Sequence, residues 1–242
     1  MRTLGVIGGL GPMATAYFMQ LVVEMTDASA DQEHIEMIVH SKPQIPDRTQ
    51  YILKKSPQNP LPEMIEIEKS LIQQGAEVIA IPCITAHFFQ PDLERVGCQV
   101  IHGIEETGKY LKEENITSVG IMATDGTIES ELFQSTFNKY GIVCEIPSEE
   151  RQKDVMHLIY DDIKAGKKPE MDCFIRVKDE LKQKGAQVIL LGCTELSLLK
   201  KEKEIGSDIL DVMEVLARQS VISCGKLKKE YYHLITGERY AK

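Results

Sequence analysis

The chain has 242 residues, which is enough to bury a sizeable core in one large domain or two small ones. Hydrophobic residues make up 43% of it and charged residues 27%, as is typical of a globular protein in water. The net charge of −9 argues against nucleic acid as the main partner, because binding phosphates requires a basic surface.

Membrane association and secretion are also disfavoured. No stretch approaches the roughly 20 apolar residues of a membrane span. The start of the chain has too short an apolar run for a signal peptide, so we expect a cytoplasmic protein. There, six cysteines favour free thiols over disulfides. None of them forms a Cys-x-x-Cys pair, and we expect no metal site.

Short apolar runs alternate with amphipathic segments. In chain order, the first part predicts a strand at 4–7, a helix over 13–25, a strand at 35–39, a polar loop over 41–62, a helix over 64–72 and a strand at 78–81. The second part predicts strands at 119–122 and 142–144, a helix over 174–184, a strand at 188–191 and a helix over 210–221. This alternation favours an α/β fold with largely parallel sheets. Long loops in compact domains are often functional, so we single out 41–62.

A repeat divides the chain into two related halves. Residues 75–83 read GAEVIAIPC and residues 185–193 read GAQVILLGC, at a constant offset of 110 residues. Each copy is a predicted strand that leads to a cysteine, Cys83 or Cys193. We therefore predict two pseudo-symmetric domains, 1–105 and 106–207, each with a mostly parallel sheet flanked by helices. The segment 208–242 is expected to pack back on the first domain.

Candidate site residues gather at strand ends, where open parallel sheets bind their ligands. The positions are the glycine turn at 8–12, Cys83, the turn at 123–127 with Thr124, and Cys193. Thr85 and Thr194 follow the two cysteines at predicted helix starts. Helix N-termini present unpaired N–H groups, which bind carboxylates and stabilise thiolates. The sequence therefore predicts a small anion between two thiols.

Two equivalent thiols beside a carboxylate site indicate proton transfer at the adjacent carbon. One thiolate removes the proton from one face, and the other cysteine, as a thiol, returns a proton to the opposite face. The product has the inverted configuration. Since the reverse reaction exchanges the roles of the two groups, a duplicated framework suits this chemistry.

The glycine turn also fits a looser pattern. Gly9-x-Gly11-x-x-Ala14 follows a strand and precedes a helix, as in dinucleotide-binding folds. The next strand, however, ends without an acidic residue to hold a ribose. We favour a turn that lets a substrate approach the backbone around Gly11 and Met13.

Four motifs in this order resemble those of the aspartate/glutamate racemase family, most closely its aspartate racemase branch. They are GGLGPMAT at 8–15, PDRT at 46–49, PCITAH at 82–87 and GCTE at 192–195. The resemblance implies a cofactor-independent racemase of two α/β domains with its active site in the cleft between them. It also implies a homodimer and a small acidic amino acid as substrate. Glu195 stands where glutamate racemases tend to carry histidine, which favours aspartate.

The resemblance assigns roles by position. Cys83 and Cys193 become the two acid/base residues, and Thr85 and Thr194 become ligands of the substrate carboxylate. Two cations, Arg48 and Lys164, become partners of a side-chain carboxylate.

One position departs from the family pattern. Ile84 replaces an asparagine that contacts substrate in the family, and an aliphatic side chain cannot donate that hydrogen bond. Two alternatives therefore stay open. One is a related cysteine-dependent isomerase of the maleate or hydantoin type. The other is a non-catalytic sensor of amino acids.

Overall fold

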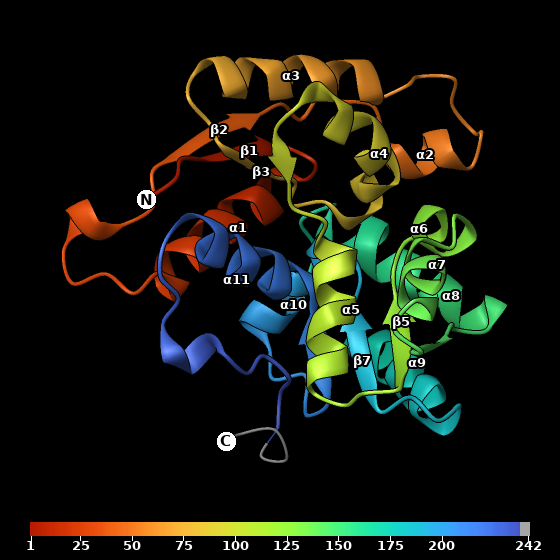
Figure 1. The fold of residues 1–242 in the computed structure, drawn as a ribbon. Helices are drawn as coiled ribbons and strands as arrows, with labels where there is room; N and C mark the ends of the chain where they lie inside the picture. The colour runs from red at the N-terminus through yellow and green to blue at the C-terminus, as the bar shows by residue number, and fades with distance from the viewer. Residues whose placement is uncertain (238–242) are drawn as a thin grey trace.

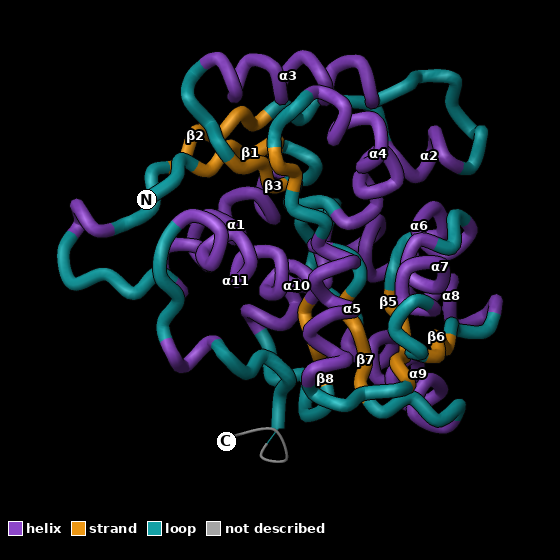
Figure 2. The backbone as a smooth tube through the Cα atoms, viewed as in Figure 1, coloured by secondary structure: helices purple, strands orange, loops and turns teal. Residues whose placement is uncertain are grey.

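Two parallel sheets with the same strand order form the framework of the computed structural model, which describes residues 1–237 (Figures 1 and 2). The first sheet runs β2 (Met37–Ser41), β1 (Leu4–Gly8), β3 (Val78–Ala80) and β4 (Gln99–Val100). The second runs β6 (Val143–Glu145), β5 (Ser118–Met122), β7 (Val188–Leu191) and β8 (Ile209–Asp211). The predicted α/β fold with two pseudo-symmetric parallel sheets is confirmed.

Helices connect the strands and cover both sheets. The α-helices are α1 (Pro12–Met25), α2 (Arg48–Ile52), α3 (Leu61–Gln73), α4 (Gln90–Leu93), α5 (Gly103–Glu113), α6 (Asp125–Glu129), α7 (Leu132–Asn138), α8 (Glu149–Met156), α9 (Met171–Gln183), α10 (Thr194–Glu202) and α11 (Val212–Cys224). A π-helix at His157–Ile163 continues α8. Short 3-10 helices lie at Asp31–Glu33, Ile84–Phe89, Glu94–Val96 and Lys229–Tyr231.

The repeated strands are buried on both faces, and their side chains alternate between two cores. Val188 and Leu190 of β7 enter a core between the two sheets, whereas Ile189 and Leu191 enter an outer core beneath α9. Equivalent residues of β3 alternate in the same way, with α3 covering the outer face of the first sheet. Burial on both faces explains why these strands appear in the sequence as continuous apolar runs.

The core between the sheets is shared. It joins the inner faces of β1 and β3 to those of β5 and β7 through side chains of α1, α5 and α11. Helix α11 packs against both α1 and α5 (Figure 1). The predicted division at residues 105 and 106 falls within α5, and residues 238–242 of the predicted returning segment lie outside the described residues. The division into domains therefore stays a prediction.

Two short elements differ from the sequence prediction. The polar loop over 41–62 contains α2, whose first turn is capped by the Asp47 side chain accepting from the Gln50 N–H at 2.8 Å. The predicted helix over 210–221 begins later, at Val212, because the residues before it pair with β7 as strand β8. Elements of three to five residues are too short for a periodic pattern to reveal.

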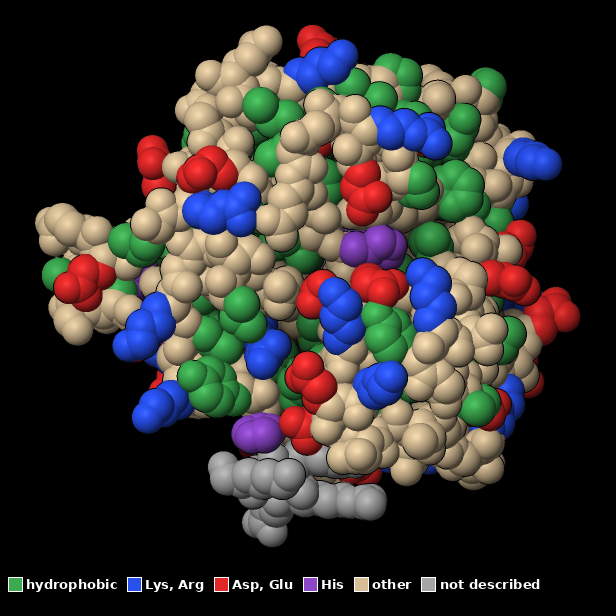
Figure 3. All heavy atoms as spheres, in the orientation of Figure 1, with side chains coloured by type: hydrophobic (Ala, Val, Ile, Leu, Met, Phe, Trp, Pro, Cys, Tyr) green, Lys and Arg blue, Asp and Glu red, His purple; other side chains and the backbone are tan. Residues whose placement is uncertain are grey.

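Charge is distributed rather than segregated on the face seen in Figure 3, where Lys and Arg side chains intersperse with Asp and Glu. Among the helices of residues 1–237, none has the length and apolar content needed to cross a bilayer.

The carboxylate of Glu68 on α3 is buried without a hydrogen bond or an ion pair in the part of the chain that the structure describes. Its side chain is fully inaccessible, and within residues 1–237 neither carboxylate oxygen has a hydrogen-bond partner. Burial raises the pKa of Glu68 from 4.5 to about 7. The unfolded chain releases this proton at lower pH than the folded protein does, so stability is lost as the pH rises from 4.5 to about 7.

We therefore expect Glu68→Gln to raise the free energy of unfolding at pH 8 by roughly 1–2 kcal/mol, with little ionisation-linked change at pH 4. Urea unfolding at several pH values measures this difference. The matched control is Glu66→Gln, at an exposed site on the same helix. A stabilisation by Glu68→Gln that did not change with pH would contradict the ionisation argument.

Candidate active site

The two cysteines of the repeat occupy equivalent positions. Cys83 follows β3 and caps the 3-10 helix Ile84–Phe89, and Cys193 follows β7 and caps α10. Both are almost fully buried. The first N–H groups of a helix have no partner within it, so each thiol lies beside backbone donors suited to an anion.

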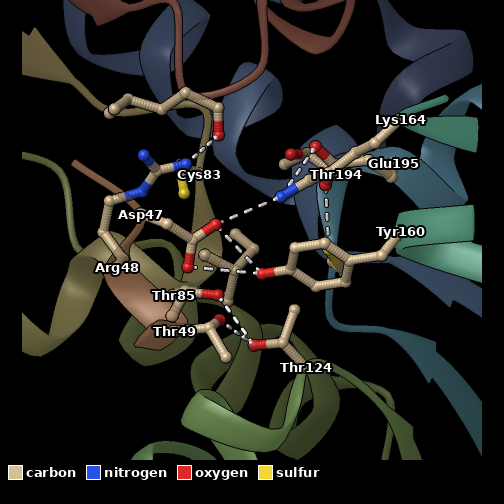
Figure 4. Close-up of a pocket in the computed structure, with 13 residues that line it drawn as sticks. Asp47, Arg48, Thr49, Cys83, Thr85, Thr124, Tyr160, Lys164, Thr194 and Glu195 are labelled. Carbon is tan, nitrogen blue, oxygen red and sulfur yellow. Dashed lines mark hydrogen bonds and ion pairs between the residues drawn. The ribbon is translucent and has the colours of Figure 1, made fainter. Parts of the chain in front are cut away.

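Both cysteines line a cavity between the two sheets, and Figure 4 shows Cys83 among the residues around it. The cavity is narrow, with a volume of about 10 Å³, roughly enough for one water molecule. Eight of the predicted site residues line it: Arg48, Cys83, Ile84, Thr85, Thr124, Lys164, Cys193 and Thr194. The other two, Gly11 and Met13, line an adjoining groove.

Arg48 lies inside the protein with its guanidinium beside Cys83. Its Nη1 donates to the carbonyl oxygens of Ile45 at 3.3 Å and Pro46 at 3.0 Å, and its Nη2 donates to that of Leu10 at 3.0 Å. Burial alone would lower the pKa of Arg48, but its negative neighbours, the Cys83 thiolate first among them, raise it above its ordinary value. A thiolate at Cys83 therefore faces a fixed positive charge.

Cys193 lies beside a carboxylate instead. Its Sγ donates to Glu195 Oε2 at 2.9 Å, and both side chains are buried. Burial and the negative charge of Glu195 raise the pKa of Cys193 well above its ordinary value, against the opposing charge of Lys164. Cys193 is therefore held as a thiol, with a proton to donate.

Contacts across the cleft surround these thiols (Figure 4). Lys164 Nζ lies 3.9 Å from Glu195 Oε1 and 3.9 Å from Asp47 Oδ2. The Tyr160 hydroxyl donates to Asp47 Oδ2 at 3.2 Å, and Lys164 Nζ lies 4.1 Å from the centre of the Tyr160 ring. Burial lowers the pKa of Lys164, but the surrounding negative groups, led by Glu195, outweigh it and raise the pKa. Because Asp47 precedes α2 and Lys164 follows the π-helix, these contacts join the two halves.

A network of buried threonine hydroxyls also spans the cleft. Thr124 Oγ1 accepts from Thr49 Oγ1 at 3.2 Å and lies 3.1 Å from Thr85 Oγ1. Thr127 Oγ1 donates to Thr85 Oγ1 at 3.0 Å. Thr49 and Thr85 belong to the first half and the other two to the second. The hydroxyls of Thr85 and Thr124 are thus engaged within the protein.

His87 holds the backbone of Cys83. Its Nε2 accepts from the Gly103 N–H at 3.0 Å, so Nδ1 carries the proton and donates to the Cys83 carbonyl at 3.1 Å. Burial, with the neighbouring His102, lowers the pKa of His87 to about 3. His87 is therefore neutral and structural.

The cavity contains residues that the sequence analysis did not assign to the site: Leu10, Asp47, Thr49, Tyr160 and Glu195. Asp47 and Thr49 flank Arg48 in the PDRT motif, and Glu195 follows Thr194 in the GCTE motif. Their positions in these two motifs could have identified all three as site residues. Tyr160 lies one helical turn before Lys164, in a segment without a distinctive pattern.

Within residues 1–237, no group of three or more His, Cys, Asp or Glu side chains is arranged to hold a metal ion.

Comparison with known proteins identifies the family. The Asp/Glu/hydantoin racemase family model matches residues 7–220, so the chain belongs to this family. The structure of Picrophilus torridus aspartate racemase matches with a TM-score of 0.83 at 27% identity, over 96% of this chain and 98% of that one. The aspartate racemase branch indicated by the sequence motifs is supported accordingly.

Two further relatives extend the comparison. The broad specificity amino-acid racemase RacX of Bacillus subtilis is 24% identical over 230 residues, which cover 90% of this chain and 96% of RacX. Glutamate racemase of Francisella tularensis, solved with D-glutamate, shares the fold with a TM-score of 0.64 at 17% identity, over 90% of this chain and 79% of that one.

The contact between Cys193 and Glu195 gives a prediction about thiol reactivity. Glu195→Gln removes the negative charge that raises the pKa of Cys193, so we expect Cys193 to be alkylated roughly tenfold faster at pH 7.5, for a drop of about one pKa unit. Iodoacetamide labelling with peptide mass spectrometry measures the rate at each cysteine. Glu202→Gln, at the exposed end of α10, is the control. An unchanged rate at Cys193 in Glu195→Gln would show that this carboxylate does not control the thiol.

Proposed function

We propose that the protein is a cofactor-independent amino-acid racemase in which Cys83 and Cys193 are the two acid/base groups. The observation that carries the proposal is the pair of buried thiols at equivalent strand ends of one cavity, with opposite charges beside them. Its membership of the Asp/Glu/hydantoin racemase family supports the same reaction class.

The charges suggest the resting protonation states. A thiolate formed at Cys83 would lie beside the Arg48 guanidinium, whereas Glu195 keeps Cys193 protonated. Cys83 would then remove the Cα proton of one enantiomer while Cys193 protonates the opposite face. After this turnover the roles are reversed, so the other enantiomer meets a Cys193 thiolate and a Cys83 thiol.

Backbone donors at the two helix starts suit the substrate α-carboxylate. The N–H groups that follow Cys83 and Cys193 belong to the first turns of their helices, where positive helix-dipole ends favour an anion. They also lie where negative charge develops as the Cα proton leaves. Thr85 and Thr194 provide such groups, in agreement with the roles that the family resemblance gives them.

Aspartate is the first substrate to test, since the structure of P. torridus aspartate racemase is similar, and RacX supports a broader range. The alternatives of maleate or hydantoin isomerisation and of sensing without turnover belong in the same screen. The homodimer and the cytoplasmic location remain predictions.

The two-base proposal predicts distinct losses in two variants. Cys83→Ser and Cys193→Ser should each lower the racemisation rate at least 10³-fold, because a serine hydroxyl is a far weaker acid than a thiol. Cys193→Ser retains the Cys83 base, so it should still exchange the α-proton of one enantiomer. Polarimetry and NMR of single enantiomers in deuterated water separate inversion from exchange.

Cys144→Ser, a cysteine outside the cavity, is the matched control and should keep the wild-type rate. Full racemisation by either active-site variant would exclude the two-base scheme. If a broad panel of amino acids neither inverted nor exchanged with the wild-type protein, the racemase proposal itself would fail.

A further inference from the structure

A groove adjoins the active-site cavity on one side. Its volume is about 630 Å³, within the roughly 300–1,000 Å³ of small-molecule sites. It lies between the β1–α1 turn, the loop that precedes α2, and residues from the π-helix and α10. Groove and cavity share five lining residues: Leu10, Asp47, Arg48, Lys164 and Glu195.

The groove is the space that a substrate side chain can enter. The cavity, at about 10 Å³, has no room for a side chain beside the Cα that the two thiols must flank. Another hollow of about 690 Å³, beside α6 and α8, shares only Tyr160 with the cavity. The cavity therefore has a wider border with the groove than with the other hollow. We call the five residues that cavity and groove share the common wall.

The charges on this wall already balance. Arg48 and Lys164 are opposed by Asp47 and Glu195, which leaves a formal sum of zero. Both Nη atoms of Arg48 donate to backbone carbonyls, and Lys164 lies 3.9 Å from each of the two carboxylates. Arg48 Nε is buried without a hydrogen-bond partner among residues 1–237. A substrate side-chain carboxylate would nevertheless add a fifth charge to a wall whose four formal charges cancel, and a net charge is disfavoured at a partly buried site.

Beyond that wall the groove is mostly apolar. Leu10, Met13, Pro43, Ile163 and Leu198 line it, and outside the shared charged residues its polar side chain is the uncharged Gln44. Met13 is 68% exposed, so a large apolar side chain stands at the rim without being buried in the core. Such a lining suits an aliphatic or thioether stem.

We propose that this groove receives the substrate side chain, and that the preferred substrates are α-amino acids with long, uncharged side chains such as those of methionine and glutamine. This inference rests on the proposed racemase reaction and defines its substrate class. It places such amino acids above aspartate, whose side chain is both short and anionic.

Matched substrates test the proposal on the wild-type protein. Exchange of the α-proton in deuterated water gives kcat/KM for methionine, glutamine, glutamate and alanine. We expect glutamine to exceed glutamate at least tenfold, because the two differ in charge and hardly in shape, and methionine to exceed alanine at least tenfold. Glutamate at or above glutamine, or alanine at or above methionine, would overturn the assignment of the groove. Exchange by none of these amino acids nor by aspartate would instead overturn the racemase proposal.

A charge inserted in the groove provides the second test. Met13→Lys places a cation at the rim and should raise the ratio of glutamate to glutamine kcat/KM at least tenfold. Val23→Lys, at a 43% exposed site of the same helix outside the groove, is the matched control and should leave that ratio unchanged. Equal ratios in the two variants would show that the substrate side chain does not lie in the groove.

Discussion

The apolar core shared by the two sheets is the constraint on which the site depends. Because β3 and β7 are buried on both faces, helices must cover each sheet on two sides, and α1, α5 and α11 serve both sheets at once. This packing leaves the carboxyl ends of the two strands at one cavity. Two thiols separated by 110 residues thereby line one cavity.

The backbone around the two thiols is equivalent, but the charges beside them are not. Arg48, the first residue of α2, lies beside Cys83, whereas beside Cys193 the Glu195 carboxylate accepts a hydrogen bond from the thiol and outweighs the charge of Lys164. In the proposed two-base reaction one group acts as a base and the other as an acid, and the opposite charges beside the two thiols suit this division of roles. The 3.9 Å ion pairs and the threonine hydroxyls that cross the cleft join the two halves around the cavity.

Prediction from sequence succeeded where a residue's surroundings are dictated locally. The strands at 78–81 and 188–191 were predicted because doubly buried strands are continuously apolar, and the cysteines followed from the repeat. The two residues of β4 and the three of β8 carry no periodic pattern, since their pairing with longer strands creates them. Tyr160 could not be assigned to the site from sequence, because its segment has no distinctive pattern and its partner Asp47 lies 113 residues away along the chain.

The sequence by itself determined the fold class, the duplication, the family and the two thiols, because apolar patterning and motifs are written locally along the chain. Only the tertiary structure decided which charge faces each thiol, how narrow the cavity is and what lies beside it. Electrostatic environment and shape depend on distances between residues far apart in sequence. The balanced charges of Arg48, Lys164, Asp47 and Glu195, which bear on substrate choice, appear only once the two halves are packed together.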